Sequence, residues 1–215
     1  MIGDEAPALP ANGAGLGARL VSLLIDRFAL RERSRAVIAV GGESASGKSL
    51  TAEALARGLD ASGLPTAILH QDDYYHRPPR ANHEYRSADL KRVGPQEVDF
   101  ERLQSHIADF RHGRGAVAAP LVDYPNDLFS TQMLDFSRVA VLVVEGTYVL
   151  QLEATDIRIF LEATHADTAA RRRARNRDID EPVIDQILAI EHAIVALHAG
   201  RADIVIDRDF AIRTG

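Results

Sequence analysis

Cysteine is absent from the chain, and its apolar runs are short. Without cysteine there are no disulfides and no thiolate metal sites, which is compatible with a reducing compartment. The longest apolar runs, such as residues 139–144, have the length of a strand rather than that of a membrane span. The N-terminus carries Asp4 and Glu5 where a secretory signal is basic. We therefore expect a cytoplasmic protein with no membrane partner.

The chain also lacks a net positive charge, sequence repeats and the histidine spacings of metal sites, each of which marks another class of protein. Its formal net charge is −6, which gives no reason to expect a nucleic-acid partner. Its eight histidines include no H-E-x-x-H pair, and no internal repeat or low-complexity tract appears. Its 215 residues, 46% of them apolar, are enough for one sizeable core. We expect a single domain, residues 1–215, and the composition leaves open whether it forms a homo-oligomer.

A phosphate-binding motif is the strongest positive signal. Residues 42–49 read Gly-Glu-Ser-Ala-Ser-Gly-Lys-Ser, which has the spacing G-x-x-x-x-G-K-[ST]. An apolar, β-branched run precedes the motif at 35–41, and apolar residues follow it at helical spacing from 50 to 59. Glycines let backbone N–H groups point inward, and the new helix adds the positive end of its dipole. The segment therefore predicts an anion site.

The side chains of this motif have separate roles in nucleotide binding. Lys48 is expected to reach the β- and γ-phosphates of ATP and is a candidate catalytic residue, and Ser49 is expected to give its hydroxyl to Mg²⁺. The predicted nucleotide-binding residues run from the end of the strand into the helix: Gly42, Glu43, Ser44, Ala45, Ser46, Gly47, Lys48, Ser49 and Leu50. The alternative is a glycine-rich turn with a solvated lysine, which the strand and helix context disfavours.

Strand-like and helix-like segments alternate along the chain. Five apolar segments are predicted to be strands: 35–41, 65–70, 139–144, 157–161 and 202–206. Helical patterns cover five others: 16–30, 50–59, 95–111, 166–177 and 183–198. The run at 139–144 is apolar throughout, which indicates a strand covered on both faces. The pattern predicts an α/β fold of the P-loop NTPase type, a doubly wound sheet of about five mostly parallel strands flanked by helices.

The remaining segments are expected to be irregular or peripheral. Residues 1–34 are predicted to form a loose arm followed by an outer helix. Residues 117–122 read as a short strand or extended piece that leads into a turn at 123–127. Residues 80–96 are polar and irregular, and we expect about 76–96 to form a loop on the substrate side.

Acidic residues follow two predicted strands, at the sheet edge where parallel α/β folds bind ligands. Asp72 is our candidate general base, because transfer of a phosphoryl group to an alcohol needs a carboxylate that accepts the hydroxyl proton. Asp73 points to the other face of an extended chain, so only one of the two is expected to reach the hydroxyl. Glu145 ends its strand where P-loop enzymes present an acid to Mg²⁺. The alternatives are turn-capping acids and a solvated strand-end acid.

Arginines and tyrosines supply the other candidate contacts. Five arginines fall within 171–177, a density that is costly unless anions are nearby. We therefore expect about 171–181 to form a lid in which Arg172, Arg175 and Arg177 contact the nucleotide. A solvated face paired with acidic neighbours, or a nucleic-acid patch, is the alternative. Tyr75 and Tyr124 are suited to stack on or hydrogen-bond a flat substrate, and packing roles stay open for both.

Together these segments resemble the uridine kinase family, which is related to phosphoribulokinase and nicotinamide riboside kinase among the P-loop kinases. The resemblance runs from about Val37 to Phe210. It rests on residues 42–49, Gln-Asp-Asp-Tyr-Tyr at 71–75, Val-Val-Glu-Gly at 143–146, the arginine helix at 171–177 and Ala-Asp-Ile-Val-Ile at 202–206. It implies that Asp72 is the base and that Glu145 serves Mg²⁺. It also implies that lid arginines hold the ATP phosphates and that an aromatic residue near Tyr75 lies by the substrate.

Two segments depart from the family's pattern. Uridine kinases usually carry phenylalanine-aspartate-histidine-proline where this chain has Arg-Val-Gly-Pro at 92–95. They also usually carry tyrosine-aspartate followed by histidine and arginine, where this chain has Val-Asp-Tyr-Pro-Asn-Asp at 122–127. These segments touch the nucleoside in the family. The resemblance therefore places Asp123 and Tyr124 near the substrate and leaves the acceptor open.

The sequence thus predicts a kinase that uses ATP and Mg²⁺ and moves the γ-phosphoryl group to a hydroxyl of a small metabolite. A nucleoside such as uridine is the leading acceptor. The alternatives are nicotinamide riboside, pantothenate or a sugar phosphate as acceptor, and a regulatory ATPase that binds nucleotide but phosphorylates no metabolite. The expected partner is a small molecule rather than a nucleic acid.

Overall fold

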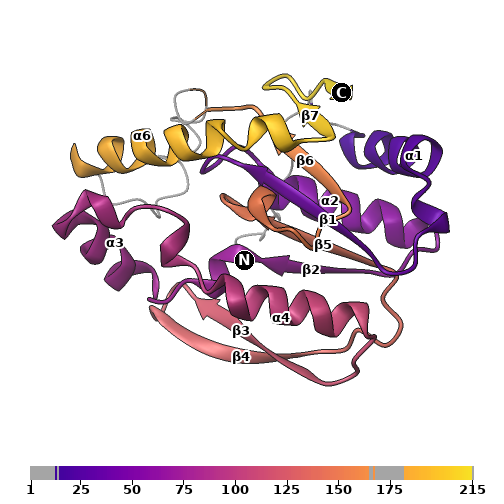
Figure 1. Cartoon of the computed structure of the whole chain (residues 1–215), viewed down its shortest axis with the longest axis horizontal. Coiled ribbons are helices and arrows are strands. Elements are labelled where there is room, and N and C mark those ends of the chain that lie inside the picture. Colours follow the sequence, from indigo (N-terminus) through magenta and orange to yellow (C-terminus); the bar gives the residue numbers. More distant parts are fainter. Residues whose placement is uncertain (1–12, 14, 165–166, 168–181, 215) are drawn as a thin grey trace, which may run out of the picture.

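The computed structural model describes residues 13, 15–164, 167 and 182–214, which form an α/β fold around a six-stranded sheet (Figure 1). The strand order is β2-β5-β1-β6-β7-β8, in which the first five are parallel and β8 is antiparallel to β7. The strands of this sheet are β1 Ala36–Gly42, β2 Thr66–His70, β5 Val141–Gly146, β6 Ile157–Leu161, β7 Ile204–Ile206 and β8 Ile212–Thr214. The five predicted strands are confirmed, and β8 is an addition too short to leave a periodic signal.

The two central strands bring the functional segments to one edge of the sheet. Every residue of β1 and β5 is buried, as expected for parallel strands with helices on both faces. Val40 pairs with Glu145, and His70 of β2 pairs with Glu145 from the other side. Because all three strands are parallel, the phosphate loop after β1, the acid at the end of β5 and the segment after β2 leave the sheet at the same carboxyl edge.

Helices cover both faces of the sheet. Among the described residues they are α1 Leu16–Phe28, α2 Lys48–Ala61, α4 Phe100–Arg111 and α6 Pro182–Ala196. Ile38 and Val40 of β1 belong to an apolar core shared with α1 and α2, whereas Val37 and Ala39 belong to a second core shared with α4 and α6. This alternation along one strand confirms the doubly wound arrangement.

Helix α1 packs very closely on α2. A Cβ atom at Gly17 would lie 2.4 Å from the backbone oxygen of Ala54, so only glycine permits this approach. The predicted N-terminal helix is confirmed within two residues, and the predicted arm before it lies outside the described residues apart from Gly13. α1 thereby covers one face of the sheet, as Figure 1 shows.

Segment 80–96 is not the irregular loop that the sequence predicts. It contains helix α3, Pro79–Ala88, followed by two short 3₁₀ helices at Leu90–Arg92 and Pro95–Glu97. Helix α4 accordingly begins at Phe100, capped by the Asp99 carboxylate, and not near residue 95. The interpretation failed because α3 has no apolar stripe, and long-range polar contacts hold it instead.

A separate hairpin lies beside α4 at one end of the domain (Figure 1). Its strands are β3 Val117–Asp123 and β4 Leu128–Leu134, which pair antiparallel from Val117↔Leu134 to Asp123↔Leu128. The predicted turn at 123–127 connects them, so that part of the prediction is confirmed. The second strand was missed because most of its side chains are exposed, and it therefore shows no alternation of apolar and polar residues.

The C-terminal helical stretch is rich in apolar residues. By length and composition alone, Val183–Arg201 is apolar enough to cross a membrane. In the fold, Ile187, Leu188 and Val195 of this stretch are buried, and Glu191 is buried beside an arginine. Only 22% of the apolar stretch is buried, so packing on the described part of the chain accounts for a minority of its apolar residues.

Candidate active site

The phosphate loop curls back on itself between β1 and α2. Gly42 and Gly47 have φ angles of 154° and 102°, in the region that favours glycine. A Cβ atom at Gly42 would lie 2.8 Å from the backbone oxygen of Leu161, so the loop is also packed against β6. The backbone oxygen of Glu43 accepts hydrogen bonds from the Ser46 N–H at 3.1 Å and from Lys48 Nζ at 2.8 Å. The Lys48 ammonium therefore lies over the loop itself.

The first turn of α2 completes this anion site. Its N-terminus follows Gly47, and no side chain caps it. The N–H groups of this first turn therefore stay available to an incoming anion, together with the positive end of the helix dipole. This is the arrangement that the motif at 42–49 predicts for polyphosphate binding.

Glu145 lies at the centre of a polar cluster beside the phosphate loop. Its Oε1 accepts a hydrogen bond from Ser49 Oγ at 3.2 Å and lies 2.7 Å from His70 Nδ1. Burial by itself raises the pKa of Glu145, but the hydrogen bond from His70 and the charge of Lys48 outweigh it and lower that pKa. The carboxylate is therefore ionised at neutral pH. The structure thus brings together the two residues that the sequence assigns to the metal.

His70 is a member of this cluster that sequence reasoning missed. Burial lowers its pKa, but the hydrogen bond and charge of Glu145 reverse that effect, so the pKa is raised. The only available signal was its position as the last residue of β2, two residues before Asp72. That position gains meaning only when β2 is paired with β5.

The oxygen atoms of Ser49 and Glu145 fit Mg²⁺. Both are hard donors, and Mg²⁺ in phosphoryl-transfer sites is bound by one or two protein oxygens, with water and substrate phosphates completing the shell. No group of three or more histidine and acidic side chains able to hold a metal occurs in the part of the chain that the structure describes. An ion at this place would therefore depend on the nucleotide for further ligands.

Asp72 and Asp73 are consecutive residues of a short 3₁₀ helix, Gln71–Tyr74, that follows β2. Asp72 has solvent access, and its Oδ2 accepts a hydrogen bond from the Tyr124 hydroxyl at 3.1 Å. Asp73 is buried, and its Oδ1 accepts the Val122 N–H at 2.8 Å. Asp73 therefore anchors the hairpin, and Asp72 is left to face the site.

The surroundings of Asp72 suit a proton acceptor. Desolvation by the protein atoms packed around the carboxylate and the nearby charge of Glu145 raise its pKa. Lys48, Tyr124 and His70 oppose that rise. A carboxylate whose pKa is raised is, in its ionised form, more basic than an ordinary aspartate.

Gly146 allows the segment that carries Asp72 to pack against the end of β5. A Cβ atom at residue 146 would lie 2.3 Å from the Cβ of Gln71. The Gln71 side chain, fully buried, accepts the Tyr148 N–H through Oε1 at 2.7 Å. The segment that carries Asp72 is therefore packed directly on the residues that follow Glu145.

The predicted acceptor-side residues have different surroundings. Asp123 accepts hydrogen bonds from the backbone N–H of Asn126 at 3.1 Å and from its side-chain amide at 2.8 Å, and so it shapes the hairpin turn. Tyr124 contacts Asp72, as described above. Tyr75 accepts a hydrogen bond from Arg86 Nη2 at 3.2 Å. Direct binding of substrate by these residues stays a prediction.

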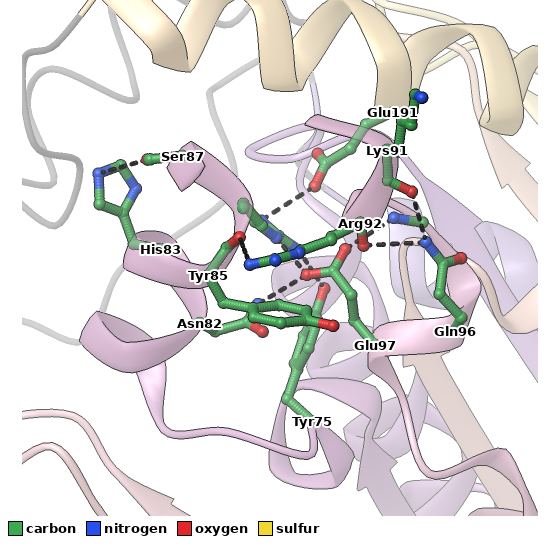
Figure 2. Close-up of polar contacts among 12 residues, drawn as sticks. Tyr75, Asn82, His83, Tyr85, Ser87, Lys91, Arg92, Gln96, Glu97 and Glu191 are labelled. Carbon is green, nitrogen blue, oxygen red and sulfur yellow. Dashed lines mark hydrogen bonds and ion pairs between the residues drawn. The ribbon is translucent and has the colours of Figure 1, made fainter. Parts of the chain in front are cut away.

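Arg86 of α3 organises a buried polar network on this side, which sequence reasoning missed. Figure 2 shows Tyr75, Asn82, Glu97 and Glu191 converging from separate segments. Arg86 pairs with Glu97 through Nε and with Glu191 Oε1 through Nη1 at 3.3 Å. Asn82 donates to the same Glu97 oxygen at 2.9 Å. One cation thus ties α3 to the 3₁₀ helix before α4 and to α6.

Helix α6 also reaches the phosphate loop. His192 Nδ1 lies 2.6 Å from Glu43 Oε1. Because Glu191 and His192 are consecutive on a helix, their side chains leave α6 about 100° apart, one toward Arg86 and one toward the loop. The predicted lid residues Arg172, Arg175 and Arg177 lie outside the described residues, and so does the predicted helix at 166–177 apart from Asp167.

Two pockets adjoin the acceptor side but not the phosphate loop. One, of about 330 Å³, is lined by residues that include Asp73, Tyr75 and Arg102. A second, of about 770 Å³, shares His76 and Asp99 with it. Neither is lined by Lys48, Ser49 or Glu145. The chemistry of the phosphate loop, and not the size of a cavity, therefore locates the transfer site.

Comparison with known proteins agrees with this geometry. The chain is 30% identical over 164 residues to the uridine kinase of Macrococcus caseolyticus, covering 72% of this chain and 77% of that protein. It is 29% identical over 193 residues to the bifunctional alpha-galactosidase/sucrose kinase AgaSK of Mediterraneibacter gnavus, covering 83% of this chain. This chain spans only 21% of the length of AgaSK.

Solved structures show the same fold. The "putative fructose transport system kinase" of Silicibacter sp. TM1040 superposes with a TM-score of 0.61 at 25% identity, covering 86% of this chain and 93% of that one. A possible uridine kinase from Bacillus stearothermophilus gives a TM-score of 0.58 at 20% identity, covering 88% and 98%. The model of the phosphoribulokinase/uridine kinase family matches residues 37–209, which include the phosphate loop, Asp72 and Glu145. The chain is a P-loop kinase and belongs to the phosphoribulokinase/uridine kinase family.

Proposed function

We propose that the protein transfers the γ-phosphoryl group of ATP, with Mg²⁺, to a hydroxyl of a small metabolite, and that a nucleoside such as uridine is the first acceptor to test. The observation that carries the proposal is the position of Asp72. Asp72 directly follows Gln71, which packs on Gly146 beside Glu145, and its carboxylate accepts a hydrogen bond from Tyr124. A proton acceptor therefore stands beside a site built for a polyphosphate.

Each residue has one task in this reaction. Lys48 and the N–H groups of residues 42–49 hold the phosphate oxygens and neutralise charge on them. Asp72 accepts the proton of the acceptor hydroxyl while the hydroxyl oxygen forms a bond to the γ-phosphorus. The bond from the γ-phosphorus to the β,γ-bridging oxygen breaks at the same time, which releases ADP. Mg²⁺, when bound by Ser49 and Glu145, would supply further charge neutralisation at the β- and γ-phosphates.

A free sugar is the second candidate acceptor. It is favoured by the likeness to AgaSK and to the fructose transport system kinase, whose names include a sugar. Arg-Val-Gly-Pro at 92–95 replaces the segment that usually contacts the nucleoside in uridine kinases, which also favours a free sugar. A purely regulatory ATPase is less well supported, because a switch has no use for a base on the acceptor side.

The test is ADP release from Mg·ATP with a panel of acceptors: uridine, cytidine, nicotinamide riboside, pantothenate, ribulose phosphate, fructose and sucrose. We expect at least one of them to stimulate ADP release well above the basal rate. D72N should keep ATP affinity and lose about 10²- to 10⁴-fold in turnover, the usual contribution of a general base. Steady basal hydrolysis that no compound stimulates would favour the regulatory ATPase, and near-normal turnover in D72N would remove Asp72 as the base.

A further inference from the structure

Glu191 of α6 is a buried carboxylate that the transfer step does not use. The residue is 6% exposed, and its polar contact among the described residues is the ion pair of Oε1 with Arg86. Burial raises its pKa, and the charges of Arg86 and Lys48 oppose that rise while Asp72 adds to it. Arg86 also donates to the hydroxyl of Tyr75, which lies three residues after Asp72, and His192, the next residue of α6, contacts Glu43 of the phosphate loop. Contacts of its partner and of its neighbour therefore link Glu191 to both the segment that carries the base and the phosphate loop.

Other polar groups around Glu191 have hydrogen-bonding capacity left. The Tyr148 hydroxyl is fully buried, feels the charge of Glu191, and has no hydrogen-bond partner in the described part of the chain. Asn82 Oδ1, on the far side of Arg86, is likewise buried and unpaired there. Buried polar groups in proteins are normally hydrogen-bonded. Glu191 thus belongs to a buried cluster that includes several hydrogen-bonding groups.

The charges of this buried cluster restrict which acceptor molecules can bind beside it. Arg86 already serves Glu97, Glu191 and the Tyr75 hydroxyl, so it is not available to bind a phosphate or carboxylate of the substrate. Asp72 and Glu191 would repel an anionic acceptor, whereas hydroxyl groups donate readily to carboxylates. The groups described on this side therefore suit a neutral molecule with several hydroxyls.

We propose that Glu191, held in place by Arg86, binds hydroxyl groups of an uncharged, polyhydroxylated acceptor. The inference rests on the proposed function and narrows it. Nucleosides and free sugars fit this subsite, whereas sugar phosphates and pantothenate do not. Glu191 is then a specificity-determining residue, distinct from Asp72, which receives the proton.

The first test is E191Q, assayed with uridine and with fructose at saturating Mg·ATP. Loss of a hydrogen bond to a charged group is expected to raise the KM of the acceptor about 10- to 100-fold. The KM of ATP should stay within about twofold of wild type, because ATP is held by the phosphate loop. D185N, an exposed substitution on the same helix, is the matched control and should leave both values unchanged.

Equilibrium binding separates this inference from the proposed function. Calorimetry of wild type and E191Q with uridine, fructose and fructose 6-phosphate, without ATP, is expected to show binding of a neutral compound that E191Q loses. Binding without phosphorylation would defeat the proposed function and leave the subsite standing. Equal binding by wild type and E191Q overturns the role of Glu191. Preference for fructose 6-phosphate, or no binding of either neutral compound, contradicts the proposal that the acceptor is an uncharged, polyhydroxylated molecule.

Deoxy analogues provide a further test, in which the wild-type measurements show whether hydroxyls are recognised and do not depend on the folding of the variant. If uridine is the acceptor, 2′-deoxyuridine and 3′-deoxyuridine each lack one hydroxyl. At least one should bind about tenfold or more weakly than uridine, and that difference should disappear in E191Q. If fructose is the acceptor, its 1-deoxy and 6-deoxy analogues serve in the same way. Equal affinity for the parent compound and every deoxy analogue contradicts recognition of hydroxyls.

Discussion

Asp72 and Asp73 are adjacent in sequence but differ completely in what their carboxylates contact. Asp73 is buried against the Val122 N–H, and Asp72 meets the Tyr124 hydroxyl and the charges of the transfer site. Strand alternation predicts that the two side chains diverge. It does not say which one faces the substrate, because that depends on where the hairpin packs.

A prediction at the scale of single residues concerns the pH dependence of Tyr124→Phe. Asp72 must be ionised to accept a proton, so kcat/KM should fall as the pH falls through its raised pKa. The hydrogen bond from Tyr124 stabilises the ionised form and lowers this pKa. Its removal should therefore shift the acidic limb of the kcat/KM profile to higher pH.

The control for this prediction is Tyr85→Phe. Tyr85 lies on α3 and stacks with Arg77 and Arg92 rather than meeting Asp72. Its profile should coincide with that of wild type. An acidic limb that stays in place in Tyr124→Phe would mean that this hydrogen bond does not set the pKa of the Asp72 carboxylate.

At the scale of elements, local patterns located the strands of the main sheet but not α3 or β4. The strands are apolar because two cores cover them, so their burial is visible in the sequence. Helix α3 has only Asn82 buried, and β4 exposes most of its side chains. Both elements depend on partners that are distant in sequence, and periodicity cannot report such partners.

The junction of β5 with the 3₁₀ helix after β2 gives a prediction at this scale. In Gly146→Ala the new Cβ atom would clash with Gln71, and overpacking of this kind typically costs about 1–3 kcal/mol. The clash should also displace the segment that carries Asp72. We therefore expect both a lower free energy of unfolding in urea and a lower turnover.

Gly115→Ala is the matched control for that substitution. A Cβ atom there would meet nothing closer than Asp135 Oδ1 at 3.8 Å, which is an ordinary contact. Its free energy of unfolding should stay close to that of wild type. If the two variants are equally stable and equally active, the close packing of Gly146 on Gln71 has no role in placing the base.

At the scale of the whole molecule, Arg86 joins parts of the chain that are about a hundred residues apart. Its side chain is 16% exposed, and those of Glu97 and Glu191 are 0% and 8% exposed. Removing one partner of a buried ion pair leaves an uncompensated charge, which typically costs about 3–5 kcal/mol. Arg86→Met is therefore expected to lower the free energy of unfolding by about that amount.

Two comparisons test this expectation by urea denaturation. Arg57→Met breaks an exposed pair with Glu53, whose loss should cost at most about 1 kcal/mol. Combining Arg86→Met with Glu97→Gln should recover part of the loss, because Glu97 no longer carries a buried charge. Equal stability of Arg86→Met and Arg57→Met would show that the network does not hold α3 and α6 together.

The sequence by itself determined the strand, loop and helix that form the phosphate site, because their signals lie within a short stretch around residues 42–49 and depend on local geometry. It also indicated the two acids at the ends of strands. Only the tertiary structure decided that His70 contacts Glu145, that Asp73 is buried against the hairpin while Asp72 is not, and that Arg86 and Glu191 form a buried ion pair. These contacts join segments far apart in the chain, and burial gives them their strength only after the sheet and helices have packed.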